Sequence, residues 1–453
     1  MKQPKASMHS LTPESRALRK RIIAYAQTRM DYDPAPLDGP KSFEALFASA
    51  GDTITAEGLG GKKALQLWEE VLSQATISSD HPGHVAYIPN APTESASAFD
   101  LVVSASSIYG GSWQEGAGAV YAENQVLEWL AREVGFPATA GGVFVQGGTV
   151  GNLSALVTAR DSARAAGIKA ERYKFVCSRE AHSSLKHAAH VMDVDIVLAE
   201  VNERGQLTGP AVEAALEGQD GVFAIVATAG TTNFGVVDKL RDVGEVARAH
   251  KLWFHIDGAY GLAGILAKST RELFDGTELA DSFIVDPHKW LFSPFDCCAL
   301  VYRDPRKAKA SHTQHAEYLE DLNEGDDFNP SDYAINLTRR PRGLPLWFSL
   351  AVHGTDAYHQ TIEETIHTTR VVTEEIRNRS YLELVREPQL SVIVFHRKGW
   401  TKTDYQTWCD KLLQDQLAFV VPSSHLGEPN LRFAIVNPRT TAKLLTKILD
   451  TLK

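Results

Sequence analysis

The chain has 453 residues, of which 43% are hydrophobic and 23% charged, the composition of an ordinary globular protein. Its formal net charge of −10 disfavours sequence-independent binding to nucleic acid or to an anionic membrane surface. No apolar run approaches the roughly 20 residues that cross a bilayer, no signal peptide is visible, and the four cysteines lack zinc-ligand spacing, so we expect reduced thiols and a cytoplasmic location.

The N-terminal part of the chain is predicted to be helical. Apolar residues at helical spacing predict helices over residues 14–30 and 62–74, with a proline-rich linker at 33–40. A chain of this length is expected to fold as two or three structural units, and we assign residues 1–85 to an N-terminal helical arm. Such an arm could pack on a partner subunit, or it could simply cap its own chain.

Strands and helices alternate from residue 141 to residue 303, after a helix predicted over residues 113–136. This alternation is typical of an α/β fold in which crossover helices flank a mostly parallel central sheet. The predicted strands lie at residues 141–145, 173–177, 195–198, 222–227, 252–257, 282–285 and 298–302. We therefore assign residues 86–354 to a large α/β domain.

The C-terminal part alternates again, after a helical run over residues 347–378 that is interrupted near Gly354. We predict a small C-terminal α+β domain over residues 355–453. Its predicted strands lie at 390–395, 419–421 and 431–436, and its helices at 402–416 and 440–452. Within the polar stretch 311–338, residues 323–330 are predicted to form a loop.

A loop at residues 81–90 contains two histidines, His81 and His84, whose spacing could suggest a metal site. Pro82 and Gly83 argue against a helix that would align them, and no acidic or cysteine ligand stands nearby. We therefore predict no metal.

A lysine directly after a buried strand is the most unusual feature of the sequence. Pro287 ends the strand predicted at residues 282–285, and His288, Lys289 and Trp290 follow it. Desolvation would lower the pKa of the Lys289 ammonium and leave a neutral amine that can condense with an aldehyde. The alternative is a lysine whose side chain extends from the strand end to solvent.

Other polar segments are predicted at the carboxyl ends of strands in the same sheet. The glycine turn at residues 147–149 stands before a helix, where free N–H groups favour a phosphate. Asp257 ends an apolar strand, and His182 and the threonines at 231–232 follow two others. Each alone has an ordinary explanation: a backbone turn, a helix N-cap or a surface position.

Together these residue types favour one cofactor. A lysine for a Schiff base, an aspartate for a pyridinium nitrogen and a helix N-terminus for a phosphate are what pyridoxal 5′-phosphate requires. The glycine turn has neither the Gly-x-Gly-x-x-Gly order of a dinucleotide site nor the Gly-Lys-Ser/Thr of a P-loop. A compact phosphorylated cofactor is therefore favoured over ATP or NAD.

Four ordered segments resemble the group II pyridoxal-dependent decarboxylases, the relatives of aromatic-L-amino-acid decarboxylase. They are Ala181-His-Ser-Ser184, Ala227-Thr-Ala-Gly-Thr-Thr232, His255-Ile-Asp-Gly-Ala-Tyr260 and Asp286-Pro-His-Lys-Trp-Leu291. The resemblance runs from about residue 15 to the C-terminus. It implies the type I fold of pyridoxal-phosphate enzymes and a homodimer with active sites at the subunit interface.

The resemblance also implies how the cofactor ring is held. Lys289 would form the Schiff base, and Asp257 would pair with the pyridine nitrogen. His182 would stack on one face of the ring, with Ala259 against the other. Thr232 would lie near the ring hydroxyl.

Two further groups of residues match family positions outside the ring. Those that match the phosphate-holding positions are Gly148, Thr149 and His288. Those that align with the substrate-binding stretch are Tyr87, Ile88 and Asn90.

The sequence departs from the family pattern at two places. Many relatives have asparagine at the position of Asp286, and a carboxylate there would repel a phosphate unless it is paired elsewhere. Family decarboxylases also carry a loop tyrosine that protonates the substrate carbanion. Alignment on Arg339 and Arg340 puts Asn329 near that place and Tyr333 a few residues later, so Tyr333 is the candidate proton donor.

The leading hypothesis is the decarboxylation of an L-amino acid to its amine and carbon dioxide, with an aromatic or bulky side chain favoured. An aldehyde-forming oxidative deaminase, a carbon–carbon lyase or an aminotransferase on the same fold is the alternative. A non-catalytic binding protein of this fold is a third hypothesis, against which the presence of Lys289 and Asp257 argues.

Overall fold

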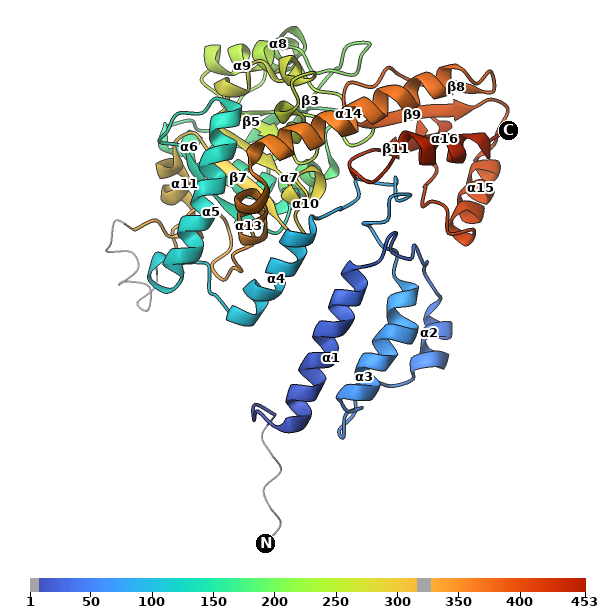
Figure 1. The fold of residues 1–453 in the computed structure, drawn as a ribbon. Helices are drawn as coiled ribbons and strands as arrows, with labels where there is room; N and C mark the ends of the chain where they lie inside the picture. The colour runs from blue at the N-terminus through green and yellow to red at the C-terminus, as the bar shows by residue number, and fades with distance from the viewer. Residues whose placement is uncertain (1–7, 316–326) are drawn as a thin grey trace.

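The computed structural model describes residues 8–315 and 327–453, and its largest element is a seven-stranded sheet (Figure 1). The strand order is β1-β7-β6-β5-β4-β2-β3. The strands are β1 (Gly141–Val145), β2 (Lys174–Ser178), β3 (Asp195–Ala199), β4 (Val222–Thr228), β5 (Trp253–Asp257), β6 (Ser282–Val285) and β7 (Cys298–Tyr302). Strands β3, β2, β4, β5 and β6 pair in parallel, whereas β7 is antiparallel to β6 and β1. The predicted mostly parallel sheet is confirmed.

Helices cover both faces of this sheet, as an apolar parallel sheet requires. One face packs against α5 (Trp113–Val134), α8 (Gly209–Leu216) and α9 (Leu240–Ala249). The other packs against α6 (Gly148–Ala165), α7 (Ser183–Met192) and α11 (Pro305–His312). Because successive strand residues point to opposite faces, Ile225 joins the first core and Val226 the second.

A second, antiparallel sheet in the order β10-β11-β9-β8 lies in the C-terminal part. Its strands are β8 (Leu382–Leu384), β9 (Val392–Arg397), β10 (Ser423–His425) and β11 (Glu428–Ala434). The helices are α13 (Leu344–His353), α14 (Thr355–Arg377), α15 (Lys402–Gln414) and α16 (Ala442–Asp450). Gly354 separates α13 from α14 with a φ of 76°, where the interruption was predicted. The domain boundaries at residues 85 and 354 remain a proposal.

The strand predicted at residues 419–421 is wrong. Phe419 forms only an isolated bridge with His84, in which the Phe419 N–H donates to the Gly83 carbonyl and the Val85 N–H donates to the Phe419 carbonyl. Pro422 follows and has no N–H for a ladder, so the strand beside β11 begins only at Ser423.

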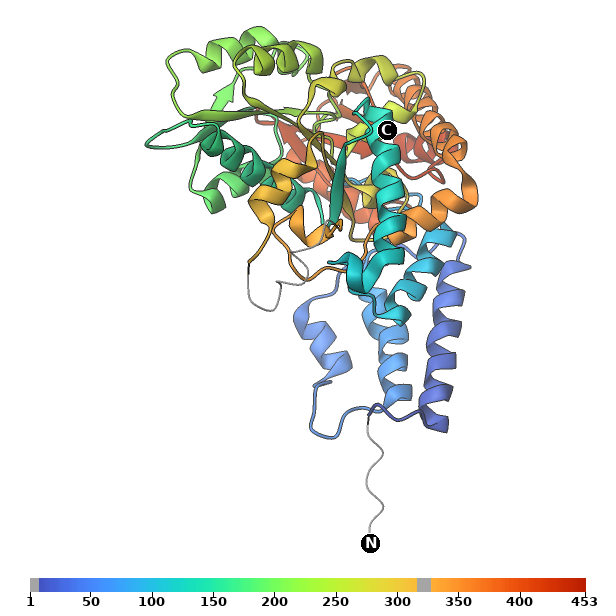
Figure 2. The same cartoon turned by 90° about the vertical axis from the view of Figure 1, so that its left-hand side faces the viewer.

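The N-terminal helices extend away from the sheet-containing body in both views (Figures 1 and 2). They are α1 (Pro13–Met30), α2 (Phe43–Ala50) and α3 (Gly61–Leu67), which continues as irregular helix to Ala75. Thr12 and Ser15 form a capping box at the start of α1, yet no residue of α1 is buried. The sequence did not predict α2 or α4 (Glu94–Ser106), whose small residues carry weak periodicity. Across the described residues, no helix is both long and apolar enough to span a membrane.

The predicted loop at 323–330 lies partly outside the described residues, which resume at 327. Residues 327–329 have no regular structure, and Pro330–Asp332 form a short 3₁₀ turn.

A buried ion pair joins α5 to the segment before α13. The Arg339 guanidinium donates to both carboxylate oxygens of Glu123, at 2.8 and 3.0 Å, and to the carbonyls of Gly110 and Phe144. Glu123 also accepts the N–H of Gly343 at 2.8 Å. Both charged side chains are only 3% exposed, so each depends on the other for compensation.

We expect Arg339→Met to lower the free energy of unfolding by about 3–5 kcal/mol, because Glu123 would be left buried and unpaired. Arg340→Met is the matched control, since Arg340 pairs with Asp100 at the surface and should contribute about 1 kcal/mol or less. Denaturant unfolding measures both. Equal losses in the two variants would contradict this interpretation.

Candidate active site

Two carboxylates follow neighbouring strands at one edge of the large sheet. Strands β5 and β6 pair in parallel with Asp257 opposite Ile284, so Asp257 and Asp286 leave the sheet at the same edge. Pro287 ends β6 and occupies the first turn of α10 (Pro287–Trp290), whose third residue is Lys289. The strand break predicted at Pro287 therefore turns the lysine back over the sheet edge.

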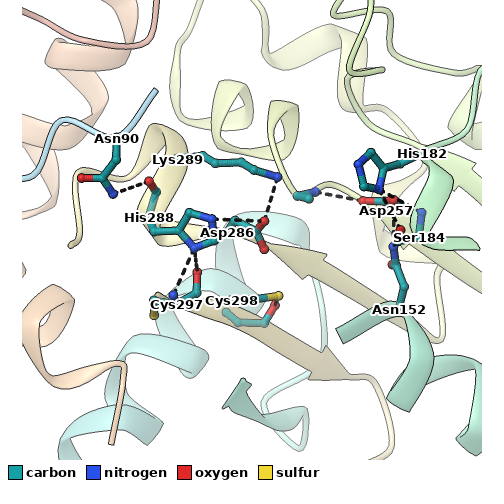
Figure 3. A network of polar contacts seen from close by, with 12 residues as sticks. Asn90, Asn152, His182, Ser184, Asp257, Asp286, His288, Lys289, Cys297 and Cys298 are labelled. Carbon is teal, nitrogen blue, oxygen red and sulfur yellow. Dashed lines mark hydrogen bonds and ion pairs between the residues drawn. The ribbon is translucent and has the colours of Figure 1, made fainter. Parts of the chain in front are cut away.

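Lys289 forms an ion pair with Asp286, with 2.8 Å between Nζ and Oδ2 (Figure 3). Burial disfavours the ammonium, but the adjacent Asp286 carboxylate and, more weakly, that of Asp257 outweigh it and raise the pKa of Lys289. The expectation that desolvation leaves a neutral amine is wrong for this state of the protein. Asp286, three residues before Lys289, supplies the counter-charge.

Asp257 is held by neutral donors instead. The Asn152 amide donates to Oδ2 at 2.9 Å and the Ala259 N–H donates to Oδ1 at 3.2 Å. The residue is 3% exposed, and it forms no salt bridge with any part of the chain that the structure describes. This buried carboxylate is thus oriented by neutral donors, and it lines the cavity described below.

A hydrogen-bonded chain that the sequence did not predict fixes Asn152. Trp253 Nε1 donates to Ser282 Oγ at 2.9 Å, Ser282 Oγ lies 2.8 Å from His255 Nδ1, and His255 Nε2 lies 2.9 Å from Asn152 Oδ1. Because the Asn152 amide nitrogen must face the Asp257 carboxylate, its oxygen accepts from His255 Nε2–H and Nδ1 accepts from Ser282. Burial, partly offset by Asp257, lowers the pKa of His255 to about 4, so the ring is neutral.

The same asparagine reaches His182 on the other side. Its amide donates to Ser184 Oγ at 3.0 Å, and Ser184 Oγ lies 2.9 Å from His182 Nδ1, which also accepts the Ser184 N–H. His182 therefore caps α7 through Nδ1, and its remaining proton is on Nε2. Figure 3 shows this group beside Asp257 and across the site from Lys289.

The glycine turn forms the start of the 18-residue helix α6. A Cβ on Gly148 would lie 3.1 Å from the Ala259 methyl and 3.3 Å from Asp286 Oδ2, so the missing side chain keeps this end of the site open. The backbone N–H groups of the first helical turn point out of the helix here, with the positive end of its dipole. His288 lies beside the turn. Its Nδ1 is hydrogen-bonded to the backbone of Cys297, and its Nε2 lies 3.7 Å from Asp286 Oδ2.

Two adjoining cavities, of about 240 and 390 Å³, open around these groups. The smaller one is lined by all eight residues predicted to hold the cofactor, which are Gly148, Thr149, His182, Thr232, Asp257, Ala259, His288 and Lys289. The larger one is reached past Lys289 and is lined in part by Tyr87 and Ile88.

Two predicted site residues lie away from these cavities. Asn90 donates its amide hydrogens to the carbonyls of His288 and Ser293, so it supports the lysine segment instead of facing a substrate. Tyr333 is 6% exposed, its ring stacks on Phe328 at 4.3 Å, and burial raises the pKa of its hydroxyl to about 12. In this structure Tyr333 belongs to the core, since its apolar ring packs there, and it lines neither cavity.

Arg432 of β11 is a site residue that the sequence analysis missed. Its guanidinium is 8% exposed and donates to the carbonyls of Tyr87, Thr232 and Asn233. Burial lowers its pKa to about 10, so it stays charged. Two separate segments of the cavity wall, at Tyr87 and at Thr232–Asn233, thus meet at this side chain.

The described residues contain no group of three or more histidine, cysteine, aspartate or glutamate side chains placed to hold a metal ion.

Comparison with known proteins gives the family context. Residues 61–398 match the sequence model of the "Pyridoxal-dependent decarboxylase conserved domain". The chain is 28% identical to an aromatic-L-amino-acid decarboxylase of Bacillus atrophaeus, over 89% of this chain and 87% of that protein. It is 31% identical to an L-2,4-diaminobutyrate decarboxylase of Rhizobium meliloti (strain 1021), over 88% of this chain and 83% of that protein. The crystal structure of Oryza sativa TDC with PLP and tryptamine superimposes with a TM-score of 0.88, at 22% identity and 98% coverage of both chains. The expected type I fold is confirmed.

We expect His255→Gln to flatten the pH dependence of stability. The folded-state pKa of His255, about 4, lies below its unfolded value of about 6.5, so its contribution is complete above pH 6.5 and is lost as the pH falls towards 4. Between pH 6.5 and pH 5 this loss is about 2 kcal/mol in the wild type and absent in the variant. Denaturant unfolding at the two pH values measures it, and an equal decline in both proteins would contradict the assignment.

Proposed function

Since the chain belongs to the pyridoxal-dependent decarboxylase family, we propose that it removes the carboxyl group of an L-amino acid as carbon dioxide and releases the amine. The family's cofactor is pyridoxal 5′-phosphate. The observation that carries the proposal is the placement of Lys289 and Asp257 on opposite sides of one cavity, with the start of α6 at its end.

The residues of this cavity fit the cofactor. The buried Asp257 carboxylate, which has only neutral donors, suits a pyridinium nitrogen, and Lys289 is the amine for the aldehyde. The open turn at Gly148 and Thr149 offers N–H groups to the phosphate, beside His288. Ala259 and His182 line the same cavity and would contact the ring.

When bound, the cofactor withdraws electrons from the substrate Cα as carbon dioxide leaves. Asp257 would hold a proton on the pyridine nitrogen, because a buried carboxylate oriented by Asn152 would stabilise that cation. Lys289 would hold the cofactor aldehyde until a substrate amine replaces it, and its own amine would then be free to carry a proton. His182 presents Nε2–H towards the cavity and can donate a hydrogen bond there, since Nδ1 is occupied.

The larger cavity supports an aromatic or otherwise bulky apolar side chain. Apolar groups on its wall come from Tyr87, Ile88, Phe295, Val421 and Pro422. No aspartate or glutamate is among the described residues that line it, so the second ammonium of diaminobutyrate would be buried without a counter-charge. The charge of Arg432 is directed at backbone carbonyls.

The test is incubation of the holoenzyme with the twenty amino acids and with 2,4-diaminobutyrate, followed by mass spectrometry of amines and measurement of carbon dioxide. We expect kcat/KM for an aromatic amino acid to exceed that for diaminobutyrate by at least about tenfold, from the unpaired-charge penalty. Lys289→Ala should lose the cofactor absorbance band and turnover. Absence of both products from every substrate would overturn the proposed function.

A second candidate is supported by the position of Tyr333. The ring of Tyr333 packs in the core and the residue lines neither cavity, so oxygen could intercept the substrate carbanion before a proton from Tyr333 reaches it. The amino acid, oxygen and water would then give an aldehyde, carbon dioxide, ammonia and hydrogen peroxide. Stoichiometric peroxide release during the same incubation would favour this reaction over amine formation.

We propose that the chain acts as a homodimer in which a second copy covers the N-terminal arm. Ile22 and Ile23 of α1 and Leu101 of α4 are about half-exposed, and with Phe292 they line a cavity of about 1190 Å³ between the arm and the body. An 18-residue helix without buried residues is marginally stable alone, and a second copy would cover it.

Four free, buried cysteines support a reducing compartment, and we propose the cytoplasm.

We expect Leu101→Asp to shift the protein from dimer to monomer in analytical ultracentrifugation, because a charge would be buried at the covered face. Leu426→Asp is the matched control, since Leu426 is 91% exposed in the turn between β10 and β11 and the change should leave the mass unaltered. A monomeric wild type would contradict the proposed dimer.

A further inference from the structure

We propose that Thr365 and Ser391 are positioning residues for Lys289. They hold the stacked rings of Trp290 and Tyr260, and through these rings the helix turn that carries the lysine. Thr365 and Ser391 line neither cavity, so they act from outside the site. The inference concerns how the attachment point of the cofactor is kept in place, and it does not depend on which reaction follows.

The helix that carries Lys289 cannot hold itself in place. It has four residues, a single turn, and no side chain caps its start. A helix this short is not stable alone, because one turn fixes several backbone dihedrals for very few hydrogen bonds. The Lys289 N–H donates to the Asp286 carbonyl and the Ser293 N–H donates to the Pro287 carbonyl, which closes the turn without attaching it to another element. The position of α10 is therefore determined by tertiary contacts.

Two side chains anchor this turn. Asn90 donates its amide hydrogens to two carbonyls of the segment. Trp290, the last residue of α10 and the neighbour of Lys289, is fully buried, and its ring stacks on Tyr260 with 5.4 Å between centroids and 19° between planes. Because a ring in a close-packed interior has little room to move, Trp290 fixes the backbone next to Lys289.

Both rings of this pair are hydrogen-bonded to the C-terminal part of the chain. Trp290 Nε1 donates to Thr365 Oγ1 of α14 at 3.1 Å. The Tyr260 hydroxyl lies 2.5 Å from Ser391 Oγ and accepts the Ser391 N–H at 3.1 Å, directly before β9. All four residues are at most 3% exposed, so a donor that loses its partner here cannot readily bond to solvent instead.

The bond to Thr365 selects one orientation of the indole ring. Stacking alone is compatible with several orientations, whereas the indole has a single N–H, and Thr365 Oγ1 is its only acceptor among the described residues. The hydroxyl is itself oriented, because it donates to the Ile362 carbonyl at 2.8 Å and so turns a lone pair to the indole. Lys289 thus projects from a backbone whose direction is set in α14.

The direction of Lys289 matters most when the cofactor becomes attached. Attachment joins Nζ to the aldehyde carbon, and the aldehyde oxygen leaves as water with two of the three ammonium hydrogens, while the third stays on Nζ. The ring and phosphate would be placed by Asp257 and by the turn at Gly148, not by the lysine. A small displacement of α10 should therefore slow attachment and leave the binding of ring and phosphate intact.

The experiment compares two ligands of the full chain after its cofactor has been removed. Pyridoxal 5′-phosphate can bond to Lys289, whereas 4′-deoxypyridoxine 5′-phosphate has a methyl group in place of the aldehyde and cannot. Stopped-flow absorbance gives the rate of attachment, and titration calorimetry gives the Kd of the analogue. We expect Thr365→Val to slow attachment about tenfold, because the buried indole N–H loses its acceptor, and to leave the Kd of the analogue within about twofold of the wild type.

Two variants of α14 serve as matched controls. Thr369 lies one turn along the same buried face, and its hydroxyl donates to the Thr365 carbonyl within the helix, so Thr369→Val should match the wild type. Thr365→Ser keeps the hydroxyl and should restore the rate.

Tyr260→Phe removes the second hydrogen bond and gives an independent test if Thr365→Val does not fold. We expect the same result, slower attachment with an unchanged Kd for the analogue. Tyr358→Phe is its control, since the buried Tyr358 hydroxyl donates to Ser349 in the same way.

Equal slowing by Thr365→Val and Thr369→Val would overturn the inference, because the loss of any buried hydroxyl would then explain both. An unchanged rate in Thr365→Val would also overturn it, as would an analogue bound about tenfold more weakly, since the whole cavity would then be altered. Neither measurement requires turnover, so a failure of the proposed decarboxylation is a separate result.

Discussion

The structure depends on keeping two buried carboxylates at one sheet edge in different electrostatic states. Asp257 and Asp286 follow the adjacent parallel strands β5 and β6, so the fold itself brings them together. Burying one unpaired carboxylate costs several kcal/mol, and two neighbouring ones also repel each other. Asp286 is compensated by a cation, whereas Asp257 is compensated by neutral donors and so retains its attraction for a ligand. The remaining features of the site maintain this difference.

The donors around Asp257 stay neutral because of two residues that do not line the cavity, His255 and Ser282. The neutral ring of His255 and the hydroxyl of Ser282 determine which way Asn152 points, and Asn152 in turn orients both Asp257 and the group that holds His182. A protonated His255 would compete with the ligand for the charge of Asp257. The low pKa of that histidine therefore keeps a competing cation away from Asp257.

The sequence predicted the large sheet well because its strands are short apolar runs with clear turn signals, and their carboxyl ends necessarily share an edge. The state of Lys289 was not predictable from its own burial, since Asp286, three residues away, outweighs desolvation. Trp253, His255 and Asp257 alternate along β5 and so share one face, a signal that could have revealed the hydrogen-bonded chain. Tyr333 and Asn90 could not be placed, because their positions depend on packing between distant segments.

Arg432 has a consequence for how this pocket can evolve. One guanidinium binds the backbones of two wall segments, at Tyr87 and at Thr232–Asn233, to the smaller sheet. The frame of the pocket is therefore specified by main-chain contacts that do not depend on which side chains project into it. Ile88, Phe295 and Val421 line the same cavity and take no part in these contacts, so we expect their exchange to change which side chain fits while the frame stays in place.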